Sequence, residues 1–340
     1  MVNAMRLIKT FMLMLVLLFC FQAASAEWVK QNTNTFAWFR DVFFVNASKG
    51  WIVGDNGTVM ATTDGGSTWT PSKKFTNDTF IQVYFTSEMN GWLLCHRDIY
   101  ARGANPSSYL RRTTDGGRTW DKIEFEGAGR ERVTKLLFNP DGKATAFGEG
   151  GIFYKLQEDG VSWKKVQTAI HFLLLDGAFG DERVGAIVGA GGTIMFTDDS
   201  GFTWEKATLL GDTDTKFNAV YFAGTKGGWA VGTQGRIFRS NGGAKLWRQQ
   251  QSDTTSNLND VYFSSPTNGW AVGDDGTILR TRDGGAVWYK VNSRTTHRLE
   301  KISFSGDRGW AVGFGGTILS YNDGPDNTDP GAKPNLQRRN

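Results

Sequence analysis

The chain has 340 residues, with 38 lysines and arginines against 34 aspartates and glutamates, so its formal net charge is only +4. Such a small positive excess argues against nucleic acid as the partner. The length exceeds that of most single domains, but closed all-β rings often reach it as one domain.

The first 26 residues have the features of an export signal. Arg6 and Lys9 give a basic start, an apolar run covers 11–21, and Ala24-Ser25-Ala26 supplies small residues for cleavage. The run is shorter than the about 20 residues that span a membrane. We therefore expect residues 1–26 to be removed, leaving a chain of net charge +2 without a membrane span; an uncleaved anchor is the alternative.

Export has two further consequences. The chain is expected outside the cytoplasm. Removal of Cys20 leaves Cys95 as the single cysteine, so no internal disulfide can form. A lipid-attachment site at Cys20 is not favoured, because the bulky Phe19 precedes it.

From Glu27 onward the chain repeats one unit seven times. Closing tryptophans recur at spacings of 51, 43, 41, 43 and 41 residues, at Trp69, Trp120, Trp163, Trp204, Trp247 and Trp288. The seventh unit breaks off after Asp323, and the missing strand stands at the other end of the chain, around Trp28. A period of about 40–50 residues predicts a propeller or a repeat array.

Each unit reads as four short strands with glycine-rich turns between them. Strand two is the Gly-Trp-Ala-Val-Gly segment, as in 269–273, and strand four carries the closing tryptophan. The sequence therefore predicts an all-β fold, a seven-bladed propeller of four-stranded antiparallel blades over 27–324, closed by the N-terminal strand. Residues 325–340 are expected to form a disordered polar tail.

The turn between strands three and four resembles the Asp-box, Ser/Thr-x-Asp-x-Gly-x-x-Trp. Its aspartate can accept backbone N–H groups within its own turn, so we assign these residues a structural role. They are Asp64, Asp115, Asp199, Asp283 and Asp323. Units three and five are degenerate, with Glu158 and Asn241 at the aspartate position.

Tryptophan placement also follows the repeat. Twelve of the 13 tryptophans occupy strand-two or strand-four positions, and Trp38 is the exception. Packing between neighbouring sheets is the expected role of the twelve. A tryptophan-rich binding surface is the alternative.

Chain direction divides the loops between two faces. The four-to-one connections and the two-to-three turns share the face opposite the Asp-boxes, and unit two inserts a long loop there between His96 and Leu110. We expect this loop face to be basic and to dock an acidic or carboxylate-bearing partner. Scattered solvated charge is the alternative. The candidate partner-binding residues are Arg97, Arg102, Arg111, Arg112, Arg130, Arg132 and Arg298.

The sequence contains few of the residue patterns that indicate catalysis. Three histidines lie in three different units, which predicts no metal site, and no nucleophile or cofactor motif occurs. The enzymatic alternative is an Asp-box glycoside hydrolase of the sialidase kind, which needs two facing carboxylates. Its candidates on the two-to-three turns are Asp55, Glu149, Asp274 and Asp275. A carbohydrate-binding propeller is a further alternative. We predict no catalytic residues, no metal and no cofactor.

The pattern from Asn268 to Trp288, Asn-Gly-Trp-Ala-Val-Gly-x-x-Gly-Thr-Ile-Leu-x-Thr-x-Asp-Gly-Gly-x-x-Trp, resembles the photosystem II stability and assembly factor family (Ycf48/HCF136-like). The resemblance covers nearly all of 27–323. It implies an exported, non-enzymatic scaffold that uses an arginine-rich surface to bind a protein partner, a subunit of a membrane complex. It also implies a location in the periplasm, or in the thylakoid lumen if the organism is photosynthetic. A monomer is expected. A periplasmic relative that serves another membrane complex fits the sequence equally well.

Overall fold

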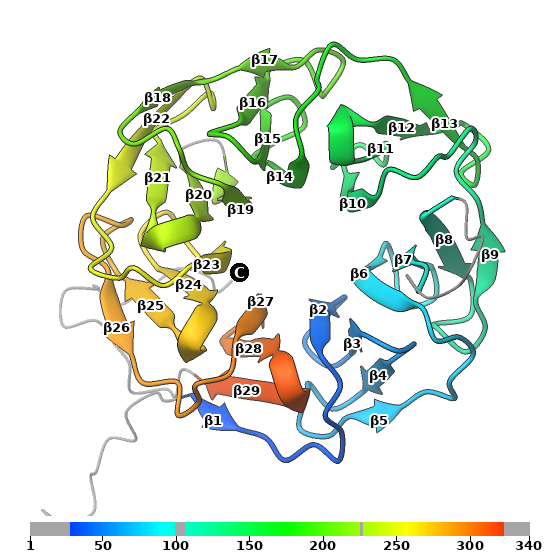
Figure 1. Cartoon of the computed structure of the whole chain (residues 1–340). Coiled ribbons are helices and arrows are strands. Elements are labelled where there is room, and N and C mark those ends of the chain that lie inside the picture. The colour runs from blue at the N-terminus through cyan, green and yellow to red at the C-terminus, as the bar shows by residue number, and fades with distance from the viewer. Residues whose placement is uncertain (1–27, 99–105, 225–226, 323–340) are drawn as a thin grey trace, which may run out of the picture.

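In the computed structural model, which describes residues 28–98, 106–224 and 227–322, seven β-sheets are arranged in a ring (Figure 1). The prediction of a seven-bladed propeller is confirmed. The predicted signal segment 1–26, the tail 325–340, Arg102 and Asp323 lie outside the described residues.

Blades 1 to 3 follow one another around the ring. Blade 1 contains β2 (Phe39–Phe44), β3 (Gly50–Gly54), β4 (Val59–Thr62) and β5 (Thr70–Pro71). Blade 2 contains β6 (Thr79–Phe85), β7 (Gly91–His96), β8 (Ser108–Thr113) and β9 (Asp121–Ile123). Blade 3 contains β10 (Val133–Phe138), β11 (Ala144–Gly148), β12 (Phe153–Leu156) and β13 (Trp163–Val166), with a 3-10 turn η1 (Glu149–Gly151).

Blades 4 to 7 complete the ring. Blade 4 contains β14 (Leu174–Phe179), β15 (Gly185–Gly189), β16 (Ile194–Thr197) and β17 (Glu205–Lys206). Blade 5 contains β19 (Phe217–Phe222), β20 (Gly228–Gly232), β21 (Ile237–Ser240) and β22 (Leu246–Gln250). Blade 6 contains β23 (Leu258–Phe263), β24 (Gly269–Gly273), β25 (Ile278–Thr281) and β26 (Tyr289–Val291). Blade 7 contains β27 (Leu299–Ser305), β28 (Arg308–Gly313), β29 (Thr317–Asn322) and β1 (Val29–Lys30).

Blade 7 is completed by the N-terminal strand, as predicted. Val29 pairs with Ser320 and Lys30 with Leu319, in antiparallel register. Trp28 is fully buried and its ring centroid lies 5.1 Å from that of Tyr321. The two ends of the fold are therefore held together in one sheet.

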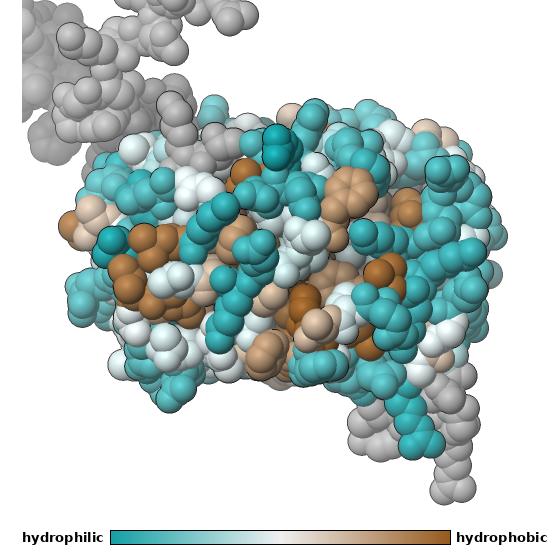
Figure 2. Space-filling model, turned by 90° about the horizontal axis from the view of Figure 1, so that it is seen from above, coloured by the Kyte–Doolittle hydropathy of each residue, from teal (hydrophilic) through white to brown (hydrophobic). Residues whose placement is uncertain are grey.

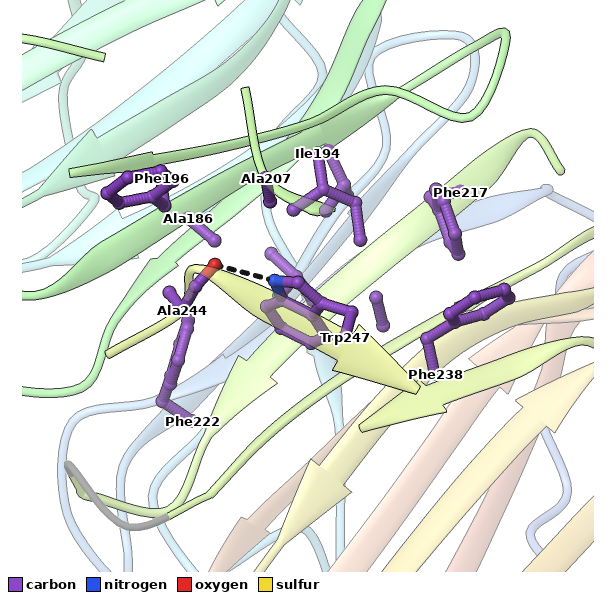
Figure 3. Packing of buried hydrophobic residues seen from close by; sticks show 12 residues of the cluster. Ala186, Ile194, Phe196, Ala207, Phe217, Phe222, Phe238, Ala244 and Trp247 are labelled. Atoms are coloured by element: carbon purple, nitrogen blue, oxygen red, sulfur yellow. Dashed lines mark hydrogen bonds between the residues drawn. The ribbon is translucent and has the colours of Figure 1, made fainter. Parts of the chain in front are cut away.

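Blade 5 departs from the four-strand prediction by one extra strand. The connection from blade 4 forms β18 (Thr208–Leu210), which pairs in parallel with β22 along the outer edge (Figure 1). Ala207, at its start, packs among the buried side chains between blades 4 and 5, near Trp247 (Figure 3). The side of the ring that is seen from above is mostly hydrophilic, with apolar residues in separate patches (Figure 2).

Most of the core lies between the blades. The strand-two tryptophans are buried; Trp51 stacks on Phe85 of blade 2 at 3.5 Å, and Trp229 on Phe263 of blade 6 at 3.5 Å. Apolar burial of large rings supplies most of the stabilisation between neighbouring sheets. The predicted inter-sheet role of the repeat tryptophans is confirmed at these positions.

The innermost strand of every blade carries a β-bulge near its start. In blade 1, for example, the register shifts between Phe39 and Asp41. A bulge redirects the following side chain, and most of the residues after the seven bulges line a cavity of about 130 Å³ between the innermost strands, which we call the channel. The residues after the bulges are Asp41, Gln82, Lys135, Asp176, Ala219, Asp260 and Lys301.

These side chains connect neighbouring blades. Asp41 accepts the N–H of Val83 at 2.9 Å, and Gln82 both accepts from and donates to the backbone of Leu136. Lys135 and Asp176 form an ion pair of 2.6 Å. Blades 1 to 4 are thus linked in sequence by buried polar contacts.

The remaining junctions are linked in the same way. Asp176 accepts the N–H of Val220 at 3.0 Å, and Asn218 donates to the carbonyl of Leu258 at 2.8 Å. Asp260 accepts the N–H of Ile302 at 2.9 Å. An ion pair of 3.5 Å between Arg40 and Glu300 joins blade 7 to blade 1.

The Asp-box turns use the side-chain geometry that their sequence predicts. Asp64 accepts the hydroxyl and the N–H of Thr68, and these bonds lower its pKa to about 2. Asp115, Asp199 and Asp283 accept equivalent backbone N–H groups. In blade 3 this role belongs to Asp159, which binds Ser162, and not to the position of Glu158.

Removal of the Trp28 side chain should open the ring. We expect Trp28→Ala to lower the free energy of unfolding by about 3–5 kcal/mol, because the side chain is fully buried between blades. Val29, which is 53% exposed, provides the control; Val29→Ala should change stability by less than about 0.5 kcal/mol. Urea unfolding followed by circular dichroism measures both, and equal effects would contradict the closure argument.

Asp41 should make stability depend on pH. Burial raises its pKa to about 6, and the nearby Lys301 and Lys135 only partly offset this. The folded chain holds this proton more tightly than the unfolded chain, so the cost of the charged carboxylate is present above pH 6 and falls as the pH drops towards 4.

From about pH 7.5 to about pH 5 we expect the wild type to gain about 1 kcal/mol relative to Asp41→Asn. The comparison cancels the opposite contribution of His96, whose pKa is lowered by burial. Urea unfolding at both pH values measures the difference. Parallel pH profiles for the two proteins would show that Asp41 does not control this dependence.

Candidate functional site

The loop face is formed by the four-to-one connections and the two-to-three turns, as chain direction predicted. The N–H of Gly57, in the β3–β4 turn, donates to the carbonyl of Asp78 at 2.7 Å, and Gly192 bonds Thr215 in the same way. At Gly57 the backbone has φ +68°, and an added Cβ would lie 2.0 Å from the carbonyl oxygen of Thr76. Glycine at this position therefore permits the close approach of the turn and the connection.

One cluster of this face lies where blade 7 meets blade 1, and we call it the mouth cluster: Trp38, Arg40, Asp55, Arg298 and Glu300. The Arg40 guanidinium forms two hydrogen bonds to the carboxylate of Asp55, at 2.8 and 2.9 Å, and lies 3.7 Å from the ring centroid of Trp38. A guanidinium held by a bidentate carboxylate and an aromatic ring has little freedom.

Arg298 extends this cluster towards blade 6. It bonds Glu300 at 2.9 Å, Asp274 at 3.1 Å and the side-chain oxygen of Asn259 at 3.2 Å. Its side chain is nevertheless 42% exposed. Of the seven arginines predicted to bind a partner, Arg298 belongs to the mouth cluster. Carboxylates from blades 6 and 7 fix its position.

Aromatic side chains border the mouth cluster. Trp38 packs edge-on against Phe314 at 5.3 Å, and Phe314 also contacts His297. Phe314 is 48% exposed, and Phe36, two residues before Trp38 in the chain, is 93% exposed. The indole N–H of Trp38 has no hydrogen-bond partner among the residues that the structure describes. Trp38, the tryptophan outside the repeat, thus belongs to a mixed aromatic and charged surface.

A second part of the loop face is the base of the blade-2 insertion. Tyr109 donates its hydroxyl to Asp78 at 2.6 Å, and the N–H of Asp98 donates to the other oxygen of Asp78 at 3.1 Å. Burial would raise the pKa of Asp78, but these bonds and that of Thr76 outweigh it and lower the pKa. The carboxylate therefore stays charged and holds both ends of the insertion.

Three cations surround the ring of Tyr109. Arg97 lies 4.7 Å, Lys122 5.0 Å and Arg111 5.6 Å from its centroid. Glu124 pairs with Lys122 at 2.8 Å and also with Arg97. The structure thus brings together two of the predicted arginines, Arg97 and Arg111, around an aromatic ring that the sequence did not single out.

Arg111 and Arg112 do not lie on a loop. Both belong to β8, where neighbouring side chains point to opposite sides of the sheet. Arg111 donates to the carbonyl of Trp120 at 3.0 Å and lies 4.8 Å from the ring of Phe75, which is 39% exposed. It is half-buried between blades 1 and 2.

The placement of Arg112 on the loop face was wrong. It stacks on its cross-strand neighbour Trp92 at 5.6 Å, at the end of β8 that enters the Asp-box turn. Arg239 stacks on Trp229 and Arg280 on Trp270 in the same register, at 5.4 and 5.1 Å. The strand register thus places an arginine opposite the strand-two tryptophan in three blades. Arg112 is therefore a recurring structural residue of the repeat.

Arg130 and Arg132 lie on the loop face beside the insertion. Arg130 is exposed and its carbonyl accepts the hydroxyl of Ser107 at 2.7 Å. Arg132 is half-buried and its backbone N–H donates to Glu149 at 2.9 Å. These two arginines lie on a different part of the face from Arg298.

The acidic candidates for hydrolysis all have other partners. Asp55 binds Arg40, Glu149 binds the backbone of Arg132, and Asp274 binds Arg298 as well as two asparagines. Asp275 lies 3.3 Å from the hydroxyl of Ser256. A catalytic acid or nucleophile needs a free carboxylate facing the substrate, so this arrangement gives no support to the glycoside hydrolase alternative.

A metal site and a membrane-spanning helix are both absent from the described residues. Histidines, cysteines and carboxylates form no group of three or more that could hold a metal ion in 28–98, 106–224 and 227–322. Across the same ranges, none of the helices has the length and apolar character needed to cross a bilayer.

Sequence reasoning missed Arg40 and Glu300. Each lies one residue before the channel-lining residue of an innermost strand, Asp41 and Lys301 respectively. The sequence does contain a sign of these two residues, because each is a charged residue near the start of a mostly apolar innermost strand. Recognising them would have required an alignment of the seven units, position by position, and the location of the β-bulge in each innermost strand.

Comparison with known proteins gives consistent results. The family model described as "Photosynthesis system II assembly factor YCF48" matches residues 21–128, 155–250 and 239–329. The Ycf48 assembly protein of Thermosynechococcus vestitus is 28% identical, over 65% of this chain and 74% of its own length. That of Trichormus variabilis, named a lipoprotein, is 25% identical over 68% and 93%.

The length of the matched region varies among relatives. In the Ycf48 protein of a Synechococcus strain, JA-3-3Ab, 26% identity extends over 41% of this chain and 42% of that protein. The chain thus spans less than half of that relative and about three quarters of the Thermosynechococcus protein.

Solved structures share the fold. YCF48 bound to a D1 peptide superposes with a TM-score of 0.70 at 24% identity, covering 89% of this chain and 95% of that one. A virginiamycin B lyase from Staphylococcus aureus gives 0.71 at 11% identity, covering 88% and 99%. These similarities show the propeller, and the second shows that an enzyme can be built on a similar ring.

The Tyr109–Asp78 bond should control the order of the insertion base. We expect Tyr109→Phe to destabilise the fold by about 1.5 kcal/mol, because it removes a hydrogen bond to a charged, partly buried acceptor. Hydrogen exchange should be faster at the N–H of Asp98 and unchanged in β24. Unchanged exchange at Asp98 would contradict the role given to this bond.

Proposed function

Because the chain belongs to the photosystem II assembly factor YCF48 family, we propose that it is an exported, non-catalytic assembly factor that binds a segment of a membrane-complex subunit on its loop face. The family match over most of the chain carries this proposal. In one solved relative the bound molecule is a D1 peptide, and by analogy we expect an extramembranous peptide segment here.

The composition of the loop face supports a protein partner. The exposed Phe314 packs on Trp38, and the partly exposed guanidinium of Arg298 lies 6.0 Å from the ring centroid of Trp38. Aromatic residues and arginine are the types that contribute most binding energy at protein interfaces. Arg298 can direct its remaining N–H to an acceptor on the partner, because Asp274 and Glu300 already hold its orientation.

The carboxylates support a non-catalytic role. On the loop face Asp55 holds Arg40 and Asp274 holds Arg298, and the three channel aspartates hold neighbouring blades together. A hydrolase or lyase on such a ring needs groups free to exchange protons with substrate. In this chain we infer that the charged groups maintain the shape of a docking surface.

We also infer export, to the periplasm or, in a photosynthetic organism, the thylakoid lumen. The basic start and short apolar run of residues 1–26 support this inference. Several relatives carry the name lipoprotein, which implies export of those proteins. A monomeric ring facing the membrane complex remains our working prediction.

The test compares two double variants in co-purification with solubilised membranes of the source organism. Arg298→Ala with Phe314→Ala should reduce the amount of bound membrane-complex subunit at least about tenfold, because it removes a charged and an aromatic contact together. The matched control, Arg282→Ala with Val287→Ala, removes an exposed arginine and an exposed apolar residue from an Asp-box turn. It should retain binding within about twofold.

If both double variants co-purify equal amounts of the membrane-complex subunit, the partner does not bind at Arg298 and Phe314, and the proposed site is wrong. A deletion strain gives the second measurement: unassembled subunits of one membrane complex should accumulate, and expression of the chain should reverse this. Normal levels of every membrane complex in the deletion strain would contradict the assembly role.

A further inference from the structure

The outer edge of a blade can accept an additional parallel strand. In blade 5, β18 pairs with β22: Leu209 lies opposite Trp247 and Leu210 opposite Arg248. Blade 3 shows the same contact in shorter form, where Glu126 forms a parallel bridge with Lys164 and donates its N–H to the carbonyl of Trp163. Leu210 and Glu126 both stand six residues after the closing tryptophan of the preceding blade.

Among the described residues blade 1 does not make this contact, and neither do blades 2, 4, 6 and 7. By the same count, Asn34 follows Trp28 by six residues and should face Thr70. The blade instead ends at β5, and its sheet contains β2, β3, β4 and β5. Thr33 donates its hydroxyl to the carbonyl of Gly316 at 2.6 Å, which holds the connection against blade 7.

A groove of about 630 Å³ lies between this connection and blade 1. We call it the rim groove. It lies between 31–35 on one side and 67–72 on the other, and Val59, Met60 and Trp69 line it. Gln31 crosses one end, donating to the carbonyl of Gly66 at 2.7 Å and accepting from the indole of Trp69 at 3.1 Å. These two bonds, together with that of Thr33 to Gly316, fix the position of the connection relative to blade 1.

The rim groove occupies the place that Leu209 fills in blade 5. Strand register makes Met60 the counterpart of Phe238, because Met60 pairs with Ile52 and Phe238 with Ala230. Leu209 packs against the buried cluster that contains Phe238 and Trp247, two of the residues drawn in Figure 3. In blade 1 the described residues place no equivalent aliphatic side chain over Met60 and Trp69.

We propose that the rim groove binds an extended segment of a partner protein, added in parallel beside Thr68–Thr70, with an aliphatic side chain over Met60 and Trp69. Backbone bonding at a free strand edge would provide affinity, and the groove would select the side chain. Pro71 has no N–H to donate to a further backbone hydrogen bond, so the added strand would be as short as β18.

Charge distinguishes a partner from the chain's own tail. Lys74 is the one charged residue among those that line the groove. In the sequence beyond Asn322 the single large aliphatic residue is Leu336, and it is flanked by Lys333, Arg338 and Arg339. A neutral or acidic segment from another protein suits the groove better. The rim groove is separate from the mouth cluster, so this inference does not depend on the function proposed for the loop face.

The probe is a fluorescein-labelled peptide with the sequence of 207–212, Ala-Thr-Leu-Leu-Gly-Asp, titrated with the full chain by fluorescence polarisation. We expect saturable binding, and at least about tenfold weaker binding of a peptide with Leu209→Asp. Hydrogen exchange should slow at 68–72 when the peptide is bound. Absence of binding up to about 1 mM, or slower exchange elsewhere alone, would overturn the proposal.

Two chain variants locate the site. Pro71→Trp places a large side chain over the groove, because residue 71 faces the same side of the sheet as its cross-strand partner Met60. It should weaken peptide binding at least about tenfold. Thr70→Trp puts the same side chain on the opposite side of the exposed strand and should leave affinity within about twofold.

Equal affinity of these two variants would overturn the proposal, and circular dichroism confirms that both fold. A third variant ends the chain at Asn322. If its free form exchanges faster at 68–72 than the full chain does, the tail occupies the groove and the partner proposal is wrong. Unchanged exchange supports the partner proposal.

Discussion

The structure depends on polar contacts that join each innermost strand to the next blade. A bulge in each innermost strand turns one side chain towards the channel, and Asp41, Gln82 and Asp176 then bond the backbone of the following blade. Buried polar groups are costly when unpaired. Correct pairing at every junction therefore fixes the rotation between blades, while the apolar rings between sheets supply most of the stabilisation.

The same strands position the loop-face chemistry. Arg40 and Glu300 stand one residue before Asp41 and Lys301, so the mouth cluster is built directly on the channel contacts. Because the backbone there is fixed by neighbouring blades, Arg298 and Arg40 keep one orientation without needing a ligand. Preorganisation of this kind reduces the entropy that binding must overcome.

Departures from the repeat mark the surfaces where partners can bind. The blade-2 insertion, Trp38 and the rim groove beside β5 are features that the repeat does not account for. A repeat position such as Arg112 has a structural explanation in its stacking on Trp92, and two other blades repeat that stacking. Comparison of the blades with one another therefore separates residues that maintain the ring from residues free to serve function.

The sequence by itself determined the seven blades, the closing role of Trp28 and the buried role of the repeat tryptophans, because each follows from local periodicity. It also identified the face that carries the long loops. Only the tertiary structure decided which side chains meet: the bulge that aims Asp41, the pairing of Arg40 with Glu300 across the closure, and the place of Arg112 beside Trp92. These depend on register and on contacts between residues far apart in the chain, which spacing along the sequence does not encode.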